Sequence, residues 1–273
     1  MPVTFSLAAG LCWGTSDFSG GYASRRSESF LVTALSHAGG LTLMLVIAFA
    51  TRAQFPSRSS QLWAAAAGVL GGLALAIFYR ALSDGMGLTA PVAAVVGAAI
   101  PAAFTIATQG VHGVLAIAGF LLAGLGIWLI SRPEGSNTNR GFFMAVLAGM
   151  GFAGFFLCIS RTGESSAIWA SVFSRLASLL LLLVIVVARR RKGPLLGSDA
   201  SLAIFAGCLD VSGTALFIRA NQTGRLDSAV VLSSLYPVLT VLLARFFLKE
   251  QFTRWKTVGI FAAVLAVPLI ALQ

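Results

Sequence analysis

The sequence predicts an all-α integral membrane protein of ten transmembrane helices, arranged as two inverted five-helix repeats. Three observations predict this fold: an apolar composition, ten apolar runs of membrane-spanning length, and internal similarity at a constant offset. Of the 273 residues, 58% are apolar and only 10% are charged, and the mean hydropathy is +0.90. A soluble domain carries roughly 25% charged residues, because its surface faces water. Most of this protein's exterior is therefore expected to face lipid.

The apolar runs have the length of about 20 residues that a helix needs to cross a bilayer. They lie at 3–22, 29–50, 61–82, 87–107, 112–130, 141–160, 165–188, 200–220, 227–247 and 254–271. A closed β-barrel would show alternating polarity instead. Met1 to Thr4 contain no basic residue, so the first run is interpreted as a retained span and not as a cleaved signal peptide.

An internal repeat divides the chain into residues 1–134 and residues 140–273, each with five predicted helices. An offset of 139 residues superposes several pairs, of which Arg80 and Arg219 are the most informative. Because five is an odd number, the second repeat is expected to enter the membrane in the opposite direction.

Basic residues between the runs are interpreted as loop charges that orient the helices. The net charge of +10 is therefore not assigned to nucleic-acid binding. The segment 109–113 has no Lys or Arg, whereas its repeat counterpart contains Lys249, Arg254 and Lys256. The positive-inside rule then places both termini outside the cytoplasm, against which Arg52 and Arg58 are the dissenting residues.

Three stretches resemble the EamA family of the drug/metabolite transporter superfamily. Ala8 to Gly14 resembles the Trp-Gly motif of its first span, and Phe217–Ala220 with Ser228–Pro237 resembles the core of its second repeat. Leu248–Thr253 resembles its glutamate-containing loop. The chain departs from the pattern at Val111-His112 and at Phe152-Ala153, which replace a glutamate loop and a second Trp-Gly motif.

This resemblance implies transport without choosing a substrate. Members of the EamA family export amino acids and other metabolites, and related families carry sugars, nucleotide sugars or drugs. Neither the residues nor the resemblance implies a cofactor or a metal ion.

Four of the ionisable residues within predicted spans are singled out, because a charge in the membrane costs a few kcal/mol unless it faces a partner or a cavity. They are Asp17, His37, Arg175 and Asp210, and they are predicted to surround a central substrate-binding cavity between the repeats. Each has an alternative reading. Arg175 and Asp210 can form a structural ion pair, His37 can be a packing histidine, and Asp17 can reach the membrane interface.

Four aromatic residues are predicted to supply the walls of the same cavity, where they can contact an amine through cation–π interactions: Trp13, Tyr79, Trp169 and Tyr236. Glycines at four-residue spacing, Gly10/Gly14 and Gly68/Gly72, are assigned to close helix packing. Pro237, within the ninth run, permits a kink.

A secondary transporter of small polar metabolites is the predicted function, with export of amino acids or related compounds as the favoured substrate class. Transport of sugars, nucleotide sugars or cationic drugs is the alternative, and a membrane scaffold or an intramembrane enzyme is the reading from a different class. The sequence lacks a phosphate-binding Gly-x-x-x-x-Gly-Lys-Ser/Thr loop. The expected partners are a small-molecule substrate and membrane lipid, and no nucleic acid is expected. The protein is expected to act as a monomer in the cell membrane, which would be the inner membrane of a bacterium.

Overall fold

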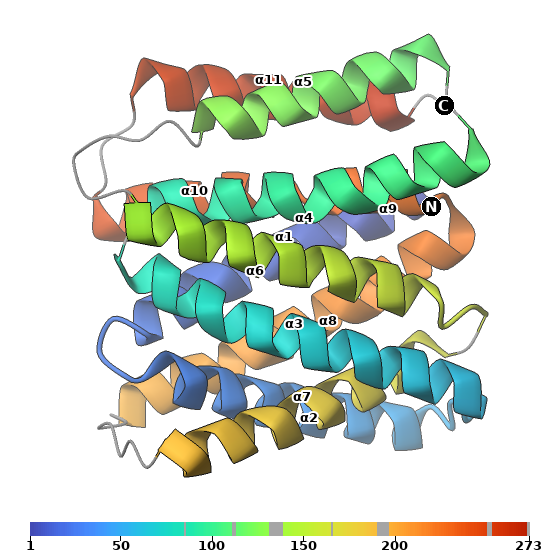
Figure 1. Cartoon of the computed structure of the whole chain (residues 1–273), viewed down its shortest axis with the longest axis vertical. Coiled ribbons are helices and arrows are strands. Elements are labelled where there is room, and N and C mark those ends of the chain that lie inside the picture. The colour runs from blue at the N-terminus through green and yellow to red at the C-terminus, as the bar shows by residue number, and fades with distance from the viewer. Residues whose placement is uncertain are drawn as a thin grey trace.

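Helices account for most of the described residues in the computed structural model (Figure 1). The structure describes residues 1–84, 86–110, 113–130, 139–164, 166–189, 197–249 and 253–271. In these ranges the first half contains α1 (Pro2–Ala23), α2 (Ser29–Ala50), α3 (Arg58–Asp84), α4 (Met86–Gln109) and α5 (Val114–Ile130). The second half contains α6 (Asn139–Ser160), α7 (Ala167–Arg189), α8 (Gly197–Thr223), α9 (Leu226–Ser233), α10 (Tyr236–Leu248) and α11 (Arg254–Ala271). No strand occurs in the described ranges.

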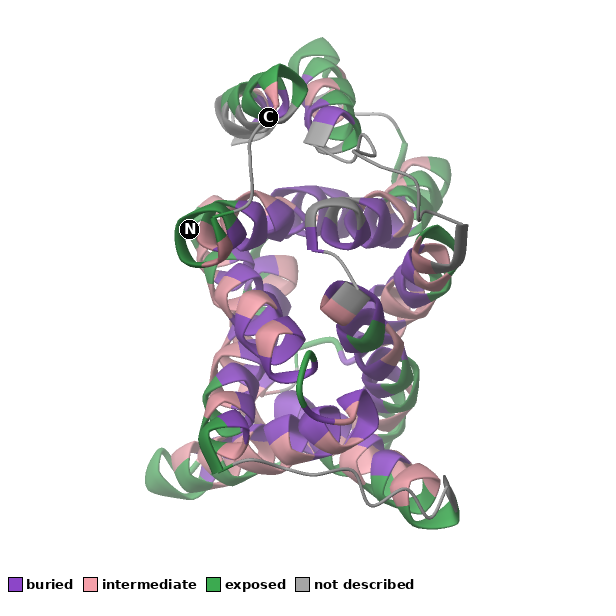
Figure 2. Ribbon diagram, turned by 90° about the vertical axis from the view of Figure 1, so that its left-hand side faces the viewer, coloured by how far each residue is buried: buried purple, intermediate pink, exposed green. Residues whose placement is uncertain are grey.

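Seven stretches of the described helices are long and apolar enough to cross a membrane. They are Ser29–Ala50, Arg58–Ser83, Val92–Gln109, Gly141–Ser160, Ala167–Ala188, Gly197–Thr223 and Leu226–Leu248. The exterior of the bundle is apolar as well, since Phe246 is 82% exposed and Val187 is 74% exposed. Figure 2 shows exposed residues on the outward faces of the helices and buried residues on the inward faces. Such a surface is suited to lipid, so the protein is an all-α multi-pass membrane protein.

The ninth predicted span, 227–247, is interrupted in the structure. It consists of α9 and α10, which are separated at Ser234 and Leu235, just before Pro237. A proline in the first turn of a helix needs no hydrogen-bond partner for its nitrogen, but it cannot continue a preceding helix. The kink expected at Pro237 is thus a break between two helices.

Helices from opposite halves of the chain pack against each other. α1 and α2 contact α8, α3 contacts α6 and α7, α4 contacts α6, and α5 contacts α11. Figure 1 shows the α5–α11 pair at one end of the molecule and α2 and α7 at the other. The middle of the bundle is therefore surrounded by helices from both halves of the chain.

Glycines allow these helices to approach at backbone distance, as the small-residue spacing predicts. A Cβ atom at Gly68 would overlap the backbone carbonyl of Ser174 in α7, and one at Gly14 would lie 2.6 Å from the carbonyl oxygen of Tyr236. Both contacts involve backbone atoms, which cannot rotate away. The packing role assigned to these glycines is confirmed, and it brings α7 and α10 close to the helices that carry the candidate site.

Candidate functional site

A pocket of about 550 Å³, including its open side, lies between helices of both halves. Its lining comes from α1, α3 and α4 in the first half and from α6, α7, α8 and α10 in the second, together with the break between α9 and α10. The lining residues are Trp13, Asp17, Gly71, Leu75, Ala93, Ala94, Gly97, Phe152, Phe155, Phe156, Arg175, Asp210, Thr214, Ser234 and Tyr236.

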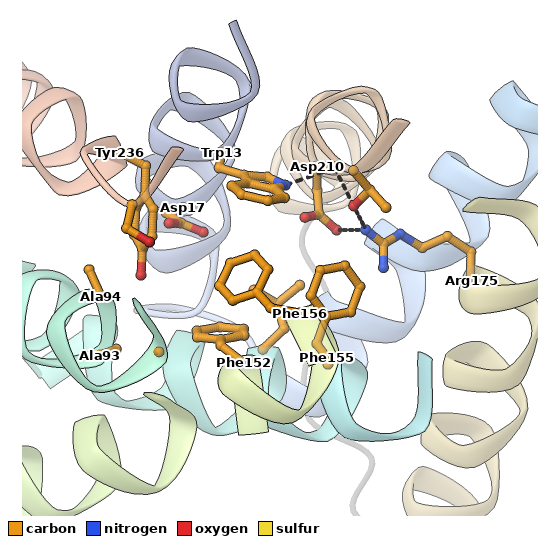
Figure 3. Close-up of a pocket in the computed structure, with 15 residues that line it drawn as sticks. Trp13, Asp17, Ala93, Ala94, Phe152, Phe155, Phe156, Arg175, Asp210 and Tyr236 are labelled. Atoms are coloured by element: carbon orange, nitrogen blue, oxygen red, sulfur yellow. Dashed lines mark hydrogen bonds and ion pairs between the residues drawn. The ribbon is translucent and has the colours of Figure 1, made fainter. Parts of the chain in front are cut away.

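An ion pair between Arg175 and Asp210 occupies one end of the pocket (Figure 3). The Nη2 atom of Arg175 lies 2.8 Å from Oδ2 of Asp210 and donates a hydrogen bond of 2.7 Å to Oγ1 of Thr214. Arg175 is only 3% exposed and Asp210 8%. Because both charges are removed from water, each depends on the other to offset its desolvation.

His37 extends this cluster from α2. Its Nε2 atom lies 3.6 Å from Oδ2 of Asp210, and its Nδ1 atom shares a hydrogen bond with the hydroxyl of Ser178. His37 is fully buried and lies behind Asp210, outside the set of residues that line the pocket. We refer to Arg175, Asp210 and His37 together as the ion-pair cluster.

The backbone of Asp210 is also fixed. Nε1 of Trp13 donates a 3.1 Å hydrogen bond to its carbonyl oxygen, and the Thr214 hydroxyl donates to the same oxygen at 3.1 Å. Trp13 therefore joins α1 to α8 while its ring lines the pocket. This arrangement holds the carboxylate of Asp210 against Arg175.

Asp17 occupies the other end of the pocket, beside Tyr236 in the view of Figure 3. It is only 6% exposed, yet no hydrogen bond or ion pair joins its side chain to another described residue. The hydroxyl groups of Tyr236 and Ser234 are buried and also have no hydrogen-bond partner in the described parts of the chain. We refer to Asp17, Ser234 and Tyr236 as the acidic end of the pocket.

Aromatic side chains form the wall between these two ends. Phe152, Phe155 and Phe156 project from one face of α6, because residues three and four apart lie on the same side of a helix. The rings of Trp13 and Phe156 have centroids 5.8 Å apart. The pocket thus combines an apolar wall with two polar ends of different character.

Of the eight residues that the sequence nominates, five line the pocket: Trp13, Asp17, Arg175, Asp210 and Tyr236. Asp17 is thus among the residues of the pocket lining. Tyr79 is fully buried behind α1, where its hydroxyl lies 3.3 Å from that of Ser16.

Trp169 lies elsewhere. Its Nε1 atom donates a 2.9 Å hydrogen bond to the carbonyl oxygen of Ala53, and its ring packs edge-on against Phe49 and Phe55. It fastens the segment that follows α2 onto α7, away from the pocket lining.

Sequence reasoning did not nominate the three phenylalanines of α6, Thr214 or Ser234. One available signal pointed to Phe152, which is the repeat equivalent of Trp13 at the 139-residue offset. Part of the predicted glutamate-containing loop, Glu250, Gln251 and Phe252, lies outside the described residues. Val111 and His112, at the corresponding place in the first repeat, also lie outside them.

Comparisons with known proteins agree with the fold. The model of the EamA-like transporter family matches residues 139–272. A solved crystal structure, described only as that of a protein, is similar with a TM-score of 0.77 and 18% sequence identity, over 99% of this chain and 96% of that chain. At this identity the similarity shows a shared fold and nothing further. No curated protein matches the chain.

The family match covers the half of the chain that supplies Phe152, Arg175, Asp210 and Tyr236 to the pocket. It agrees with the resemblance found in the sequence, and with a multi-pass membrane protein whose apolar helices enclose a pocket. The chain therefore belongs to the EamA-like transporter family, a family of drug and metabolite transporters.

Proposed function

We propose that the protein is a secondary transporter of small metabolites that carry an amino group, with amino acids or related compounds as the substrate class. The observation that carries this proposal is the buried pocket with charged and aromatic lining that helices of both halves build. Membrane transporters made of repeats place their substrates at such a position, between the repeats and near the middle of the bilayer.

The packing of the helices supports an inverted repeat of residues 1–134 and 140–273. α1 packs on α8, and its repeat equivalent α6 packs on α3. α2 also packs on α8 while its equivalent α7 packs on α3, and the pairs α2–α7 and α5–α11 join equivalent helices. Exchanging the two halves thus reproduces the same set of contacts. A two-fold relation of this kind gives a transporter two related conformations with access to opposite sides.

The break between α9 and α10 supports a site that changes shape. Ser234 lies at the break and Tyr236 begins the next helix, and both residues line the pocket. Interrupted helices beside a binding site allow backbone dihedral angles to change without unfolding a whole helix. Rocking of one half against the other can therefore alter the pocket at this point.

The chemistry of the pocket suits an amine with an apolar body. A carboxylate and an aromatic face both attract an ammonium group, and Phe152, Phe155 and Phe156 offer apolar contact. A neutral sugar would require more amide and carboxylate partners than this lining contains. A purely cationic solute is a second candidate, favoured by the 2.8 Å contact that engages Arg175 with Asp210.

We further propose that the protein acts as a monomer in the cell membrane, the inner membrane of a bacterium, surrounded by lipid. It would use no nucleic acid or cofactor, and no catalytic step is proposed. Ten spans are likewise part of this proposal, with α9 and α10 as the two parts of one interrupted span.

Counterflow in proteoliposomes tests the proposed function. Vesicles loaded with an unlabelled neutral amino acid are placed in a trace of the labelled compound, and transient accumulation of label reports exchange. We expect accumulation above that of protein-free vesicles for at least one apolar amino acid, with competition by other neutral amino acids. Absence of exchange for every amino acid and amine tested would reject the proposal.

A further inference from the structure

We infer that Asp17, together with the hydroxyl groups of Ser234 and Tyr236, is the recognition site for the ammonium group of the ligand, and that the pocket does not recognise a carboxylate. This inference rests on the proposed function and makes its substrate class specific. It predicts that amines and carboxyl esters of amino acids are better ligands than the free amino acids.

The charges of the pocket are not balanced. Its lining contains one guanidinium group, that of Arg175, and two carboxylate groups, those of Asp17 and Asp210. The contact between Arg175 and Asp210 pairs one charge of each sign. The carboxyl group of Asp17 remains, and in its ionised form it gives the pocket a formal charge of −1 that a ligand with a single positive charge would neutralise.

The surroundings of Asp17 do not supply that positive charge. Among the described residues, Asp210 in α8, Tyr79 in α3 and Tyr236 in α10 interact with it electrostatically, and none of these three is cationic. His37, on α2, contacts Asp210 and Ser178. A buried carboxylate in such a place is unfavourable unless something positively charged occupies the pocket.

Three groups that line the pocket match the N–H donors of a primary ammonium group: the carboxyl group of Asp17 and the hydroxyl groups of Ser234 and Tyr236. Both hydroxyl groups are buried without a hydrogen-bond partner among the described residues, so each has an oxygen that can accept. Trp13 lies between Asp17 and Asp210 in the view of Figure 3. Its indole can contribute a cation–π contact while its Nε1 atom stays bonded to the carbonyl oxygen of Asp210.

The opposite end of the pocket is poorly suited to a carboxylate. The Nη2 atom of Arg175 already contacts Oδ2 of Asp210 and Oγ1 of Thr214, although its buried Nε atom has no hydrogen-bond partner among the described residues. A ligand carboxylate at this end would lie beside the carboxylate of Asp210 and would have to compete with it. Together with the three phenylalanines of α6, this arrangement favours a ligand whose far end is apolar.

Equilibrium binding to the purified protein in detergent, measured by titration calorimetry, tests the inference. The probes are phenylalanine, its methyl ester, phenethylamine and N-acetylphenylalanine. We expect the ester and phenethylamine to bind more tightly than phenylalanine, and N-acetylphenylalanine to bind about tenfold or more weakly than phenylalanine, a difference of about 1.4 kcal/mol. Tighter binding of phenylalanine than of its ester, preferred binding of the N-acetyl compound, or equal binding of all four would overturn the inference.

Three variants locate the effect. Asp17→Asn should weaken the ester and phenethylamine about tenfold, whereas Asp17→Glu, which retains the charge, should keep most of the affinity. Asp199→Asn is the matched control. Asp199, at the start of α8, is also buried, but it accepts a hydrogen bond from the Ser27 hydroxyl and does not line the pocket. Unchanged amine binding by Asp17→Asn would overturn the inference. If that variant does not fold, the comparison of the four probes on the unmodified protein still decides.

The result separates the inference from the proposed function. Selective binding of amines without exchange in proteoliposomes would support the ammonium site and reject transport. Exchange of amino acids without any preference for the ammonium group would support transport and reject the ammonium site.

Discussion

The ion-pair cluster and the acidic end of the pocket contain the same kind of group, a buried aspartate, in opposite situations. Asp210 contacts Arg175 at 2.8 Å, and its backbone is held by Trp13 and Thr214. Asp17 has neither an ion pair nor a hydrogen bond to its side chain within the described residues. One aspartate is therefore suited to stabilise the fold, and the other is suited to bind. The burial of a charge alone does not distinguish these roles, whereas its partners do.

The largest expected effect is a loss of stability caused by Asp210→Asn. The change leaves Arg175 buried without its counter-ion, which costs about 3–5 kcal/mol. Thermal unfolding of the purified variant should show a much lower midpoint than that of the unmodified protein. The double variant Arg175→Gln/Asp210→Asn is the control, because a neutral pair removes both charges and should recover most of the loss. A single variant as stable as the parent would show that the pair is not structural.

Asp17→Asn should behave in the opposite way. Within the described residues, no charged group pairs with Asp17 and would be left unpaired by the change. The free energy of unfolding of Asp17→Asn should therefore stay within about 1 kcal/mol of that of the unmodified protein, or be higher. The same variant should lose about tenfold in affinity for phenethylamine. Unfolding midpoints of Asp17→Asn and Asp210→Asn, measured side by side without ligand, test the contrast. A loss of stability as large in both would contradict it.

Tyr236→Phe tests whether the Tyr236 hydroxyl takes part in binding at the acidic end of the pocket. The Tyr236 hydroxyl has no partner within the described chain, so its removal should not lower the stability of the ligand-free protein. A hydrogen bond from a bound ammonium group to this hydroxyl would contribute about 1 kcal/mol, or roughly fivefold in affinity. Calorimetry with phenethylamine measures the loss. Unchanged affinity would remove Tyr236 from the ammonium site.

The smallest expected effect on binding is in Trp169→Phe. This change removes the hydrogen bond to the carbonyl oxygen of Ala53, which should cost about 1 kcal/mol of stability. Because Trp169 does not line the pocket, affinity for phenethylamine should stay within about twofold. A larger loss of affinity would mean that the tryptophan reaches the ligand after all.

Much of the fold could be predicted because the bilayer fixes the length and composition of a helix. The predicted run 29–50 coincides with α2, and the charges of Asp17, Arg175 and Asp210 pointed inward because a membrane-embedded charge requires a partner or a cavity. Pro237 likewise indicated where a helix is interrupted.

The packing partners of individual aromatic residues could not be predicted in the same way. The chain has 20 phenylalanines, and residue type alone does not distinguish a phenylalanine that lines the pocket from one that faces lipid. Phe156 lines the pocket, whereas Phe246 is 82% exposed on the outside of the bundle. Which side of a helix faces inward is decided by contacts with distant helices, and this also explains why Trp169 was nominated for the pocket.

Counterflow of labelled phenylalanine, with the unmodified protein, Asp17→Asn and Trp169→Phe reconstituted in equal amounts, tests the central claim most directly. The claim is that the pocket carries the solute and that Asp17 is its binding charge. We predict transient accumulation of label with the unmodified protein and with Trp169→Phe, and a large loss of accumulation with Asp17→Asn. Accumulation by Asp17→Asn at the rate of the unmodified protein would contradict the claim.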